Sequence, residues 1–265
     1  MNEMPDSLLG ADEPAPVTVY NENGTSPILI VADHAGNFMP NALARLGLPV
    51  AECQRHIAWD IGVAAVCRLM AAALDATLVQ QNYSRLVIDC NRPPGSETSI
   101  PEISELTPIP GNIGLSEDRK ATRLREIFRP YHDRIAMELD RRQAGPPAAL
   151  VAMHSFTPVF KGVARPWHAA VLYNRDPHFA HLLLALLKRE AGLVVGDNEP
   201  YSVTDETDYT IPVHAERRGL HHVAIEIRQD LIADDAGQQA WSARLARLLP
   251  QVYERLVAAE LHGPV

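Results

Sequence analysis

The sequence predicts an α/β fold with a mostly parallel or mixed central sheet and helices on both faces. Short apolar runs rich in β-branched residues alternate with segments of helical periodicity, which is typical of strands and helices that follow one another in turn. Several of these apolar runs end abruptly in charged or polar residues. The length of 265 residues, without a clear linker, favours one domain over residues 1–265, with residues 1–19 as a flexible or loosely packed leader.

The first strand is expected at residues 26–32 (SPILIVA), a β-branched run that stops at the turn signals of DHAGN. Residues 59–74 have apolar positions at helical spacing. Asp60 at their start suits a helix N-terminus, where free N–H groups favour an acidic side chain. Two further strands are expected, at residues 76–80 and 86–90 (LVIDC).

The segment 91–112 is long, polar and rich in proline, and such loops inside compact domains are usually functional or mobile. The elements after it continue the alternation of helices and strands. They are a charged amphipathic helix over 115–142, strands over 148–153 and 169–173, a helix over 179–191, a strand over 223–227 and a final helix over 240–261.

Composition and charge restrict the function. The 46% hydrophobic and 22% charged residues are those of a globular protein. The formal charge of −9 argues against nucleic acid as a partner, yet a local arginine cluster could still bind a small anionic substrate.

We expect no membrane span and no signal peptide. The three cysteines have no paired spacing, so we expect free thiols and a cytoplasmic location; the oligomeric state stays open.

Four predicted strands end in residues that can carry out chemistry, and ligands bind at the carboxyl ends of strands in open α/β sheets. These ends are Asp33 with His34, residues 89–92, His154, and residues 226–230. A hydrolytic metal site needs about three protein ligands and one position open for water. His34 and His154 supply two imidazoles. The sequence therefore predicts Zn²⁺, or another divalent metal, at the edge of the sheet where these strands end.

The third metal ligand is open between two residues. Asp60 could supply a carboxylate, although a carboxylate that only stabilises the helix start explains this position too. Asn37, three residues after His34, could bind the metal or polarise the substrate, but an amide is a weak zinc ligand.

Glu226 is the candidate general base. It lies in an otherwise apolar strand (VAIEI), where an unpaired carboxylate is costly to bury, and a carboxylate can accept the proton of an activated water. The alternative is a structural ion pair with Arg228, two residues further on the same strand face.

Arginine and amide side chains flank the 86–90 segment. The planar guanidinium fork of Arg85 or Arg92, with Asn91 beside it, matches a carboxylate, which predicts an anionic substrate. The alternative for each arginine is a solvated surface position. Arg165 is a further candidate for the substrate pocket.

The motifs together resemble the N-formylglutamate amidohydrolase family, a distant branch of the zinc carboxypeptidase and aspartoacylase group. They keep one order over almost the whole chain: DHAGN (33–37), WDIG (59–62), SRLVIDCNRP (84–93), MHSF (153–156), NEPYS (198–202) and EIRQD (226–230). The resemblance implies a zinc carboxypeptidase-like fold.

The resemblance also implies roles for single residues. His34 and His154 take the two histidine ligand positions. The group's glutamate, three residues after the first histidine, is replaced by Asn37, so the carboxylate role passes to Asp60.

The substrate would be held by a second set of residues that the resemblance identifies. Asn91 and Arg92 would bind its carboxylate, Arg85 would polarise the scissile carbonyl, and Glu226 would act as the general base.

These observations predict a metal-dependent amidohydrolase that cleaves a small N-acyl amino acid such as N-formylglutamate. The alternatives are a carboxypeptidase-like peptidase and a non-catalytic protein that binds an acidic ligand. A serine hydrolase is disfavoured because the sequence has no G-x-S-x-G turn.

Overall fold

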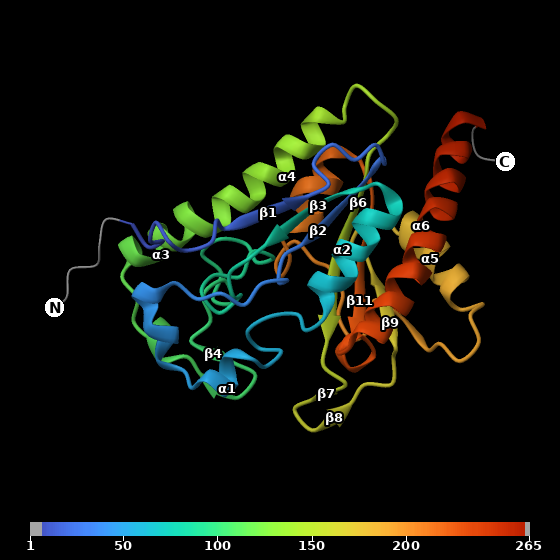
Figure 1. Cartoon of the computed structure of the whole chain (residues 1–265). Helices are drawn as coiled ribbons and strands as arrows, with labels where there is room; N and C mark the ends of the chain where they lie inside the picture. Colours follow the sequence, from blue (N-terminus) through green and yellow to red (C-terminus); the bar gives the residue numbers. More distant parts are fainter. Residues whose placement is uncertain (1–6, 263–265) are drawn as a thin grey trace.

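The computed structural model describes residues 7–262, and a seven-stranded sheet lies at its centre (Figure 1). The strands are arranged in the order β1-β3-β2-β6-β11-β9-β10. Their bounds are β1 Val17–Tyr20, β2 Ile28–Ala32, β3 Thr77–Gln81, β6 Ala149–Phe156, β9 Ala169–Leu172, β10 Val195–Asp197 and β11 His221–Arg228.

The sheet contains both strand directions. β3, β2, β6 and β11 are mutually parallel, whereas β1 is antiparallel to β3 and β9 is antiparallel to β11. β10 runs parallel to β9. The strands β2 and β6 are buried along their whole length, which explains why the sequence of β2 and the first five residues of β6 are continuous apolar runs. The predicted mixed sheet is confirmed.

Helices cover both faces of the sheet, as predicted (Figure 1). Three helices pack together on one face: α2 (Val63–Leu74), α5 (His178–Leu187) and α6 (Asp235–His262). The helix α4 (Arg129–Arg141) and long connecting segments cover the other face. Each face therefore has its own apolar core.

Shorter elements connect these layers, and their bounds are η1 Asn41–Gly47, α1 Val50–Cys53, β4 Ile103–Ser104, β5 Thr107–Pro108, η2 Pro110–Asn112, α3 Glu117–Arg123, η3 Leu124–Phe128, β7 Val159–Phe160, β8 Val163–Ala164, η4 Ile211–Ala215, η5 Glu216–Arg218 and η6 Gln229–Ile232.

The single helix expected over 115–142 is interrupted, because the wide turn η3 separates α3 from α4. Pro130, which follows it, has no N–H to donate to the preceding turn, and this favours the irregularity.

The strand expected at residues 86–90 is not formed. The run is buried as its apolar character requires, but side chains and the carbonyls of nearby loops, rather than a neighbouring strand, satisfy its backbone. Asn112 donates to the carbonyl of Leu86 at 2.9 Å, and the buried Arg123 donates to the carbonyl of Val87 at 2.8 Å. An apolar run alone could not reveal these distant partners.

The N-terminal segment also differs from its expected state as a loose leader. From residue 7 onward it packs against the body of the protein. Leu8 is buried, the backbone N–H groups of Leu8 and Leu9 donate to Glu126, and β1 pairs with β3. Residues 1–6, which belong to the same prediction, lie outside the described residues.

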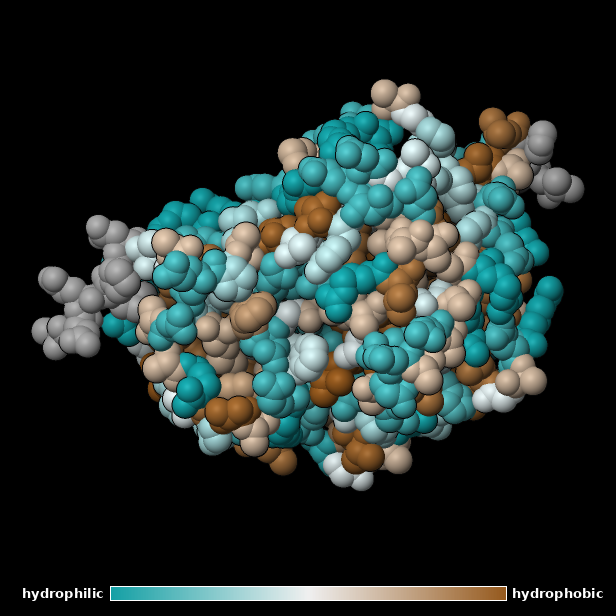
Figure 2. Space-filling model, viewed as in Figure 1, coloured by the Kyte–Doolittle hydropathy of each residue, from teal (hydrophilic) through white to brown (hydrophobic). Residues whose placement is uncertain are grey.

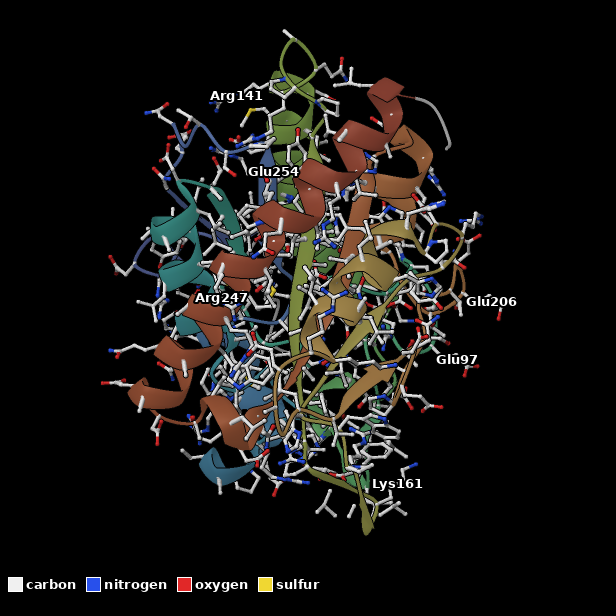
Figure 3. All side chains as sticks on the ribbon, turned by 90° about the vertical axis from the view of Figure 1, so that its right-hand side faces the viewer. Glu97, Arg141, Lys161, Glu206, Arg247 and Glu254 are labelled. Atoms are coloured by element: carbon white, nitrogen blue, oxygen red, sulfur yellow. The ribbon has the colours of Figure 1, made fainter. Side chains whose placement is uncertain are left out.

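The surface mixes hydrophilic and hydrophobic residues on the face drawn in Figure 2. Large exposed hydrophobic side chains gather on the β4–β5 and β7–β8 hairpins, at Ile103, Leu106, Val159 and Val163. Lys161 marks the tip of the second hairpin at one end of the molecule (Figure 3). Within residues 7–262, no helix is long and apolar enough to cross a bilayer.

Two buried histidines make the fold sensitive to acid. His132 Nδ1 lies 2.9 Å from His214 Nε2, and burial lowers the pKa of His132 to about 4 and that of His214 to about 3. Below pH ~6.5 the unfolded chain binds protons that the folded chain excludes, so stability is lost as the pH falls from ~6.5 to about 4. We expect each histidine to remove about 1.4 kcal/mol of unfolding free energy per pH unit in this window.

Urea unfolding at pH 7 and pH 5 measures this loss. His214→Leu should reduce the difference between the two pH values, whereas His178→Ala, at an exposed position, should leave it unchanged. An equal pH dependence in the wild type and in His214→Leu would show that this pair does not carry it.

Candidate active site

The ends of three strands and the segment that leads into α2 bring the predicted residues together. His34 follows β2, while His154 on β6 and Glu226 on β11 are direct register partners. Asp60 precedes α2, which begins at Val63 rather than at residue 59. The backbone N–H of Asp60 donates to the carbonyl of His34 at 2.9 Å, so this bond fixes the carboxylate beside the end of β2.

His34, Asp60 and His154 form a buried cluster whose potential ligand atoms all lie within 4.8 Å of one another. Both imidazoles turn Nδ1 toward the same oxygen, Asp60 Oδ2, at 3.5 Å from His34 and 3.1 Å from His154. The two ring centroids are 5.1 Å apart. Residues distant in the sequence therefore converge on one point.

A carboxylate holds the opposite nitrogen of each imidazole. Asp89 Oδ1 lies 2.7 Å from His34 Nε2, and Asp33 Oδ2 lies 3.2 Å from His154 Nε2. Burial alone would lower the pKa of His154, but the carboxylates of Asp33 and Asp60 beside it raise it well above its usual value. These contacts orient the two rings so that Nδ1 of each ring faces Asp60.

This donor set fits a divalent metal ion. His34 Nδ1 is buried and has no hydrogen-bond partner among the described residues, which is costly for a polar atom unless something else binds it. Two imidazoles and one carboxylate are a common zinc ligand set, and carboxylates that hold the outer nitrogen of such histidines are typical of metal sites.

Glu226 lies beside this cluster, and its Oε2 has no hydrogen-bond partner within residues 7–262. Burial raises the pKa of Glu226 to about 7, with the charge of Asp60 adding to the effect. The ion pair with Arg228 is absent from the described contacts, because Arg228 Nε is 2.8 Å from Asp230 instead. Glu226 is thus a buried carboxyl aimed at the cluster without a structural partner.

Arg85 lies at the rim of the same cluster. Its Nε and Nη2 donate to Asp89 Oδ2 at 3.0 and 2.7 Å, and its Nη1 lies 3.7 Å from Asp60 Oδ1. Asp89 therefore positions both His34 and Arg85, and the guanidinium presents Nη1 toward Asp60.

Asn91 and Arg92 occur together but have different environments. Asn91 Oδ1 accepts from the backbone N–H groups of Tyr209 and Thr210, and its amide donates to Asp208. It therefore anchors the segment that precedes η4. Arg92 uses only Nη1, toward two backbone carbonyls and, at 3.9 Å, toward Asp208 Oδ1. Its Nη2 and Nε have no hydrogen-bond partner among the described residues.

Two further predicted residues lie apart from the cluster. The Asn37 amide donates to the carbonyl of Cys53 at 2.9 Å, and Asn37 does not line the cavity that contains the cluster. Arg165 is buried behind that cavity: it donates to the Tyr201 hydroxyl at 2.7 Å and stacks over the rings of Phe160 and Tyr201.

The cavity has a volume of about 580 Å³ and includes residues without an assigned role in the sequence analysis. Tyr201 lines it, and Asp33 supports it from behind, where Tyr131 and Thr210 donate to Asp33 Oδ1 at 2.8 and 2.7 Å. In the sequence, Asp33 could have been recognised as a site residue only by its position, directly before His34 at a predicted strand end.

The mixed α/β fold and the histidine and carboxylate side chains at its strand ends define the class of this protein, a hydrolase. The chain belongs to the N-formylglutamate amidohydrolase family, whose model matches residues 26–233.

Two solved structures share the fold of this chain. A gene product of Agrobacterium tumefaciens is 38% identical, with a TM-score of 0.91 over 94% of this chain and 99% of that one. An N-formylglutamate amidohydrolase from Ralstonia eutropha JMP134 is 20% identical, with a TM-score of 0.63 over 92% and 98%, and this likeness concerns the fold. The search of curated proteins found no match.

Proposed function

We propose that the protein is a zinc-dependent amidohydrolase that cleaves the amide of a small, anionic N-acyl amino acid, with an N-formyl group as the acyl part. The observation that carries this proposal is the buried group of His34, Asp60 and His154 directly beside the unpaired carboxyl of Glu226. N-formylglutamate, named by the family, is the reference substrate.

His34, Asp60 and His154 would hold the metal, with Asp60 rather than Asn37 as the third ligand. A divalent cation bound there would make water more acidic and would polarise a carbonyl group. Asp89 and Asp33 lie at the opposite nitrogen of each imidazole, so that both Nδ1 atoms face Asp60 and would be available to the ion.

The other side chains carry the proton and the developing charge. Glu226 accepts the proton of the attacking water at Oε2 and passes it to the amine nitrogen as the C–N bond breaks. The products are a carboxylic acid, formate for a formyl group, and the free amino acid. Arg85 Nη1 donates to the carbonyl oxygen as negative charge grows on it.

Substrate assays test this proposal. Zinc-loaded protein is incubated with N-formyl, N-acetyl and N-succinyl amino acids and with short peptides, and amine release is followed. We expect release from the N-formyl compounds, its loss with a chelator and its recovery with added Zn²⁺. Peptide cleavage without deformylation would instead identify a peptidase, and no hydrolysis of any substrate would favour a binding protein.

Arg92 would anchor the substrate carboxylate through its free Nη2 and Nε. Arg92→Ala is expected to raise KM by about 10- to 100-fold, the effect of losing a hydrogen bond to a charged group, and to change kcat much less. Initial rates over a range of substrate concentrations separate the two parameters. An unaltered KM would place the anchor elsewhere.

A further inference from the structure

Arg165 is a buried arginine behind the cavity, and it lacks the carboxylate partner that the arginines of the cavity lining have. Carboxylates lie beside the guanidinium groups of Arg85 and Arg92. Among the described residues, Arg165 makes no ion pair, and its one side-chain hydrogen bond is donated to the Tyr201 hydroxyl. Because a buried cation without a counter-ion is costly, this position is suited to a ligand that brings a negative charge.

Three aromatic rings hold the Arg165 guanidinium in place. Its carbon lies 4.6 Å from the centre of the Phe160 ring, 4.8 Å from that of Tyr201 and 5.8 Å from that of Phe156. All three aromatic residues line the cavity. The rings attract the cation, but they carry no net charge that would neutralise it. The positive charge is therefore held directly behind the cavity surface.

The Tyr201 hydroxyl connects this charge to the cavity. Its oxygen accepts the hydrogen bond from Arg165 Nη1 at 2.7 Å, so its own hydrogen is available, and no described residue accepts it. Burial raises the pKa of Tyr201, the charge of Glu226 raises it further, and the charge of Arg165 opposes the rise. The hydroxyl is thus protonated at neutral pH and lies within electrostatic reach of both charged groups. A cation behind such a hydroxyl strengthens the hydrogen bond that it donates to an anion.

The segment that carries Tyr201 also forms the cavity wall beside Arg92. Residues 201–204, 207 and 208 line the cavity. Arg92 Nη1 donates to the carbonyl of Thr207 at 2.5 Å, while Nη2 and Nε have no partner among the described residues. Two donors for an anion therefore border one cavity at different points of the same wall. A short substrate with a carboxylate at each end is suited to contact both.

The carboxylates of the cavity lining are already balanced by cations, so they do not exclude such a substrate. Glu105 Oε2 lies 2.6 Å from Arg55 Nη2. Asp89 Oδ2 lies 2.7 Å from Arg85 Nη2. A divalent cation at the proposed metal position would add further positive charge to the same cavity.

We propose that the Tyr201 hydroxyl, held by Arg165, binds a second carboxylate of the substrate, so that the site selects N-formyl amino acids with an acidic side chain. The inference rests on the proposed amide hydrolysis and assigns the subsite for the side chain of its substrate. Arg92 binds the α-carboxylate. Arg165 is a positioning residue that acts through Tyr201.

Competing substrates test the selectivity. The values of kcat/KM are measured on zinc-loaded protein for N-formylglutamate and for N-formylglutamine, whose side chain has the same length but no charge. We expect glutamate to exceed glutamine by ~10-fold or more, the effect of a hydrogen bond to a charged group. Equal rates, or a preference for glutamine, would overturn this inference and leave the amidohydrolase intact. No hydrolysis of either compound would contradict the proposed function itself.

Tyr201→Phe tests the location, because it removes the hydroxyl and keeps the ring that stacks on Arg165. The glutamate-to-glutamine ratio of kcat/KM should fall ~10-fold or more, mainly through a higher KM for the glutamate compound. The Kd of N-formylglutamate for the Glu226→Gln protein should rise by a similar factor when Tyr201→Phe is added. Tyr20→Phe, on β1 and outside the cavity lining, is the control and should keep the wild-type ratio. An unchanged ratio in Tyr201→Phe would overturn the assignment.

A double-variant cycle tests the positioning role of Arg165. Arg165→Met should lower the same ratio about as much as Tyr201→Phe does, and the double variant should lose little more than either single variant. Arg165→Lys returns the positive charge and should restore part of the preference for glutamate. Circular dichroism shows whether each variant has kept its fold. Losses that add in the double variant, or no recovery with lysine in a folded protein, would show that Arg165 does not act through Tyr201.

Discussion

His154→Ala is expected to abolish both metal binding and turnover. His154 supplies one of the two imidazoles that meet at Asp60. Without it only two of the three ligands remain, and Asp33 loses the imidazole beside its Oδ2. The ion's contribution to transition-state stabilisation is several kcal/mol, so a fall in kcat of more than about 1000-fold is expected. Metal content per chain and kcat are measured on the same preparation.

His178→Ala is the matched control for this variant. Its imidazole is largely exposed on α5 and contacts only the neighbouring Asp176 among the described residues, so metal content and rate should match those of the wild type. Full zinc occupancy in His154→Ala would exclude it as a ligand. Circular dichroism shows whether either variant has kept its fold.

Glu226→Gln is expected to retain the metal and lose most of kcat. Glutamine preserves the size of the side chain but cannot accept the proton of the attacking water, and general-base catalysis typically contributes about 100- to 10,000-fold. The carboxyl has no hydrogen-bond partner at Oε2 within residues 7–262, so the substitution removes no described structural contact there.

The comparison for Glu226→Gln is Glu254→Gln, at an exposed position on α6 that Figure 3 labels. Steady-state rates and metal content are compared for the two variants. A Glu226→Gln enzyme with wild-type kcat would eliminate this residue as the base, and one that had lost zinc would indicate a role in holding the ion.

Much of the fold was predictable because the signals are local. The apolar runs that became β2, β6 and β11 identify strands within the run itself, and their alternation with helices predicts the mixed sheet. The run at residues 86–90 has the same pattern, yet its backbone is satisfied by Asn112 and Arg123. Partners so distant along the chain are not encoded in the run.

The candidate site shows the same division between local and distant information. The sequence places His34, His154 and Glu226 at strand ends, and the parallel sheet brings them together. The third member, Asp60, depends on a turn that bonds its backbone to His34, and the sequence favoured Asp60 without excluding Asn37.

The most direct test of the central claim is the position of a bound metal. Crystals grown with Zn²⁺ are measured at the zinc absorption edge, and an anomalous difference map is calculated. The account predicts one strong peak within bonding distance of His34 Nδ1, His154 Nδ1 and an Asp60 carboxylate oxygen. A map with no peak among these three side chains, or with its only peak at other residues, would contradict it.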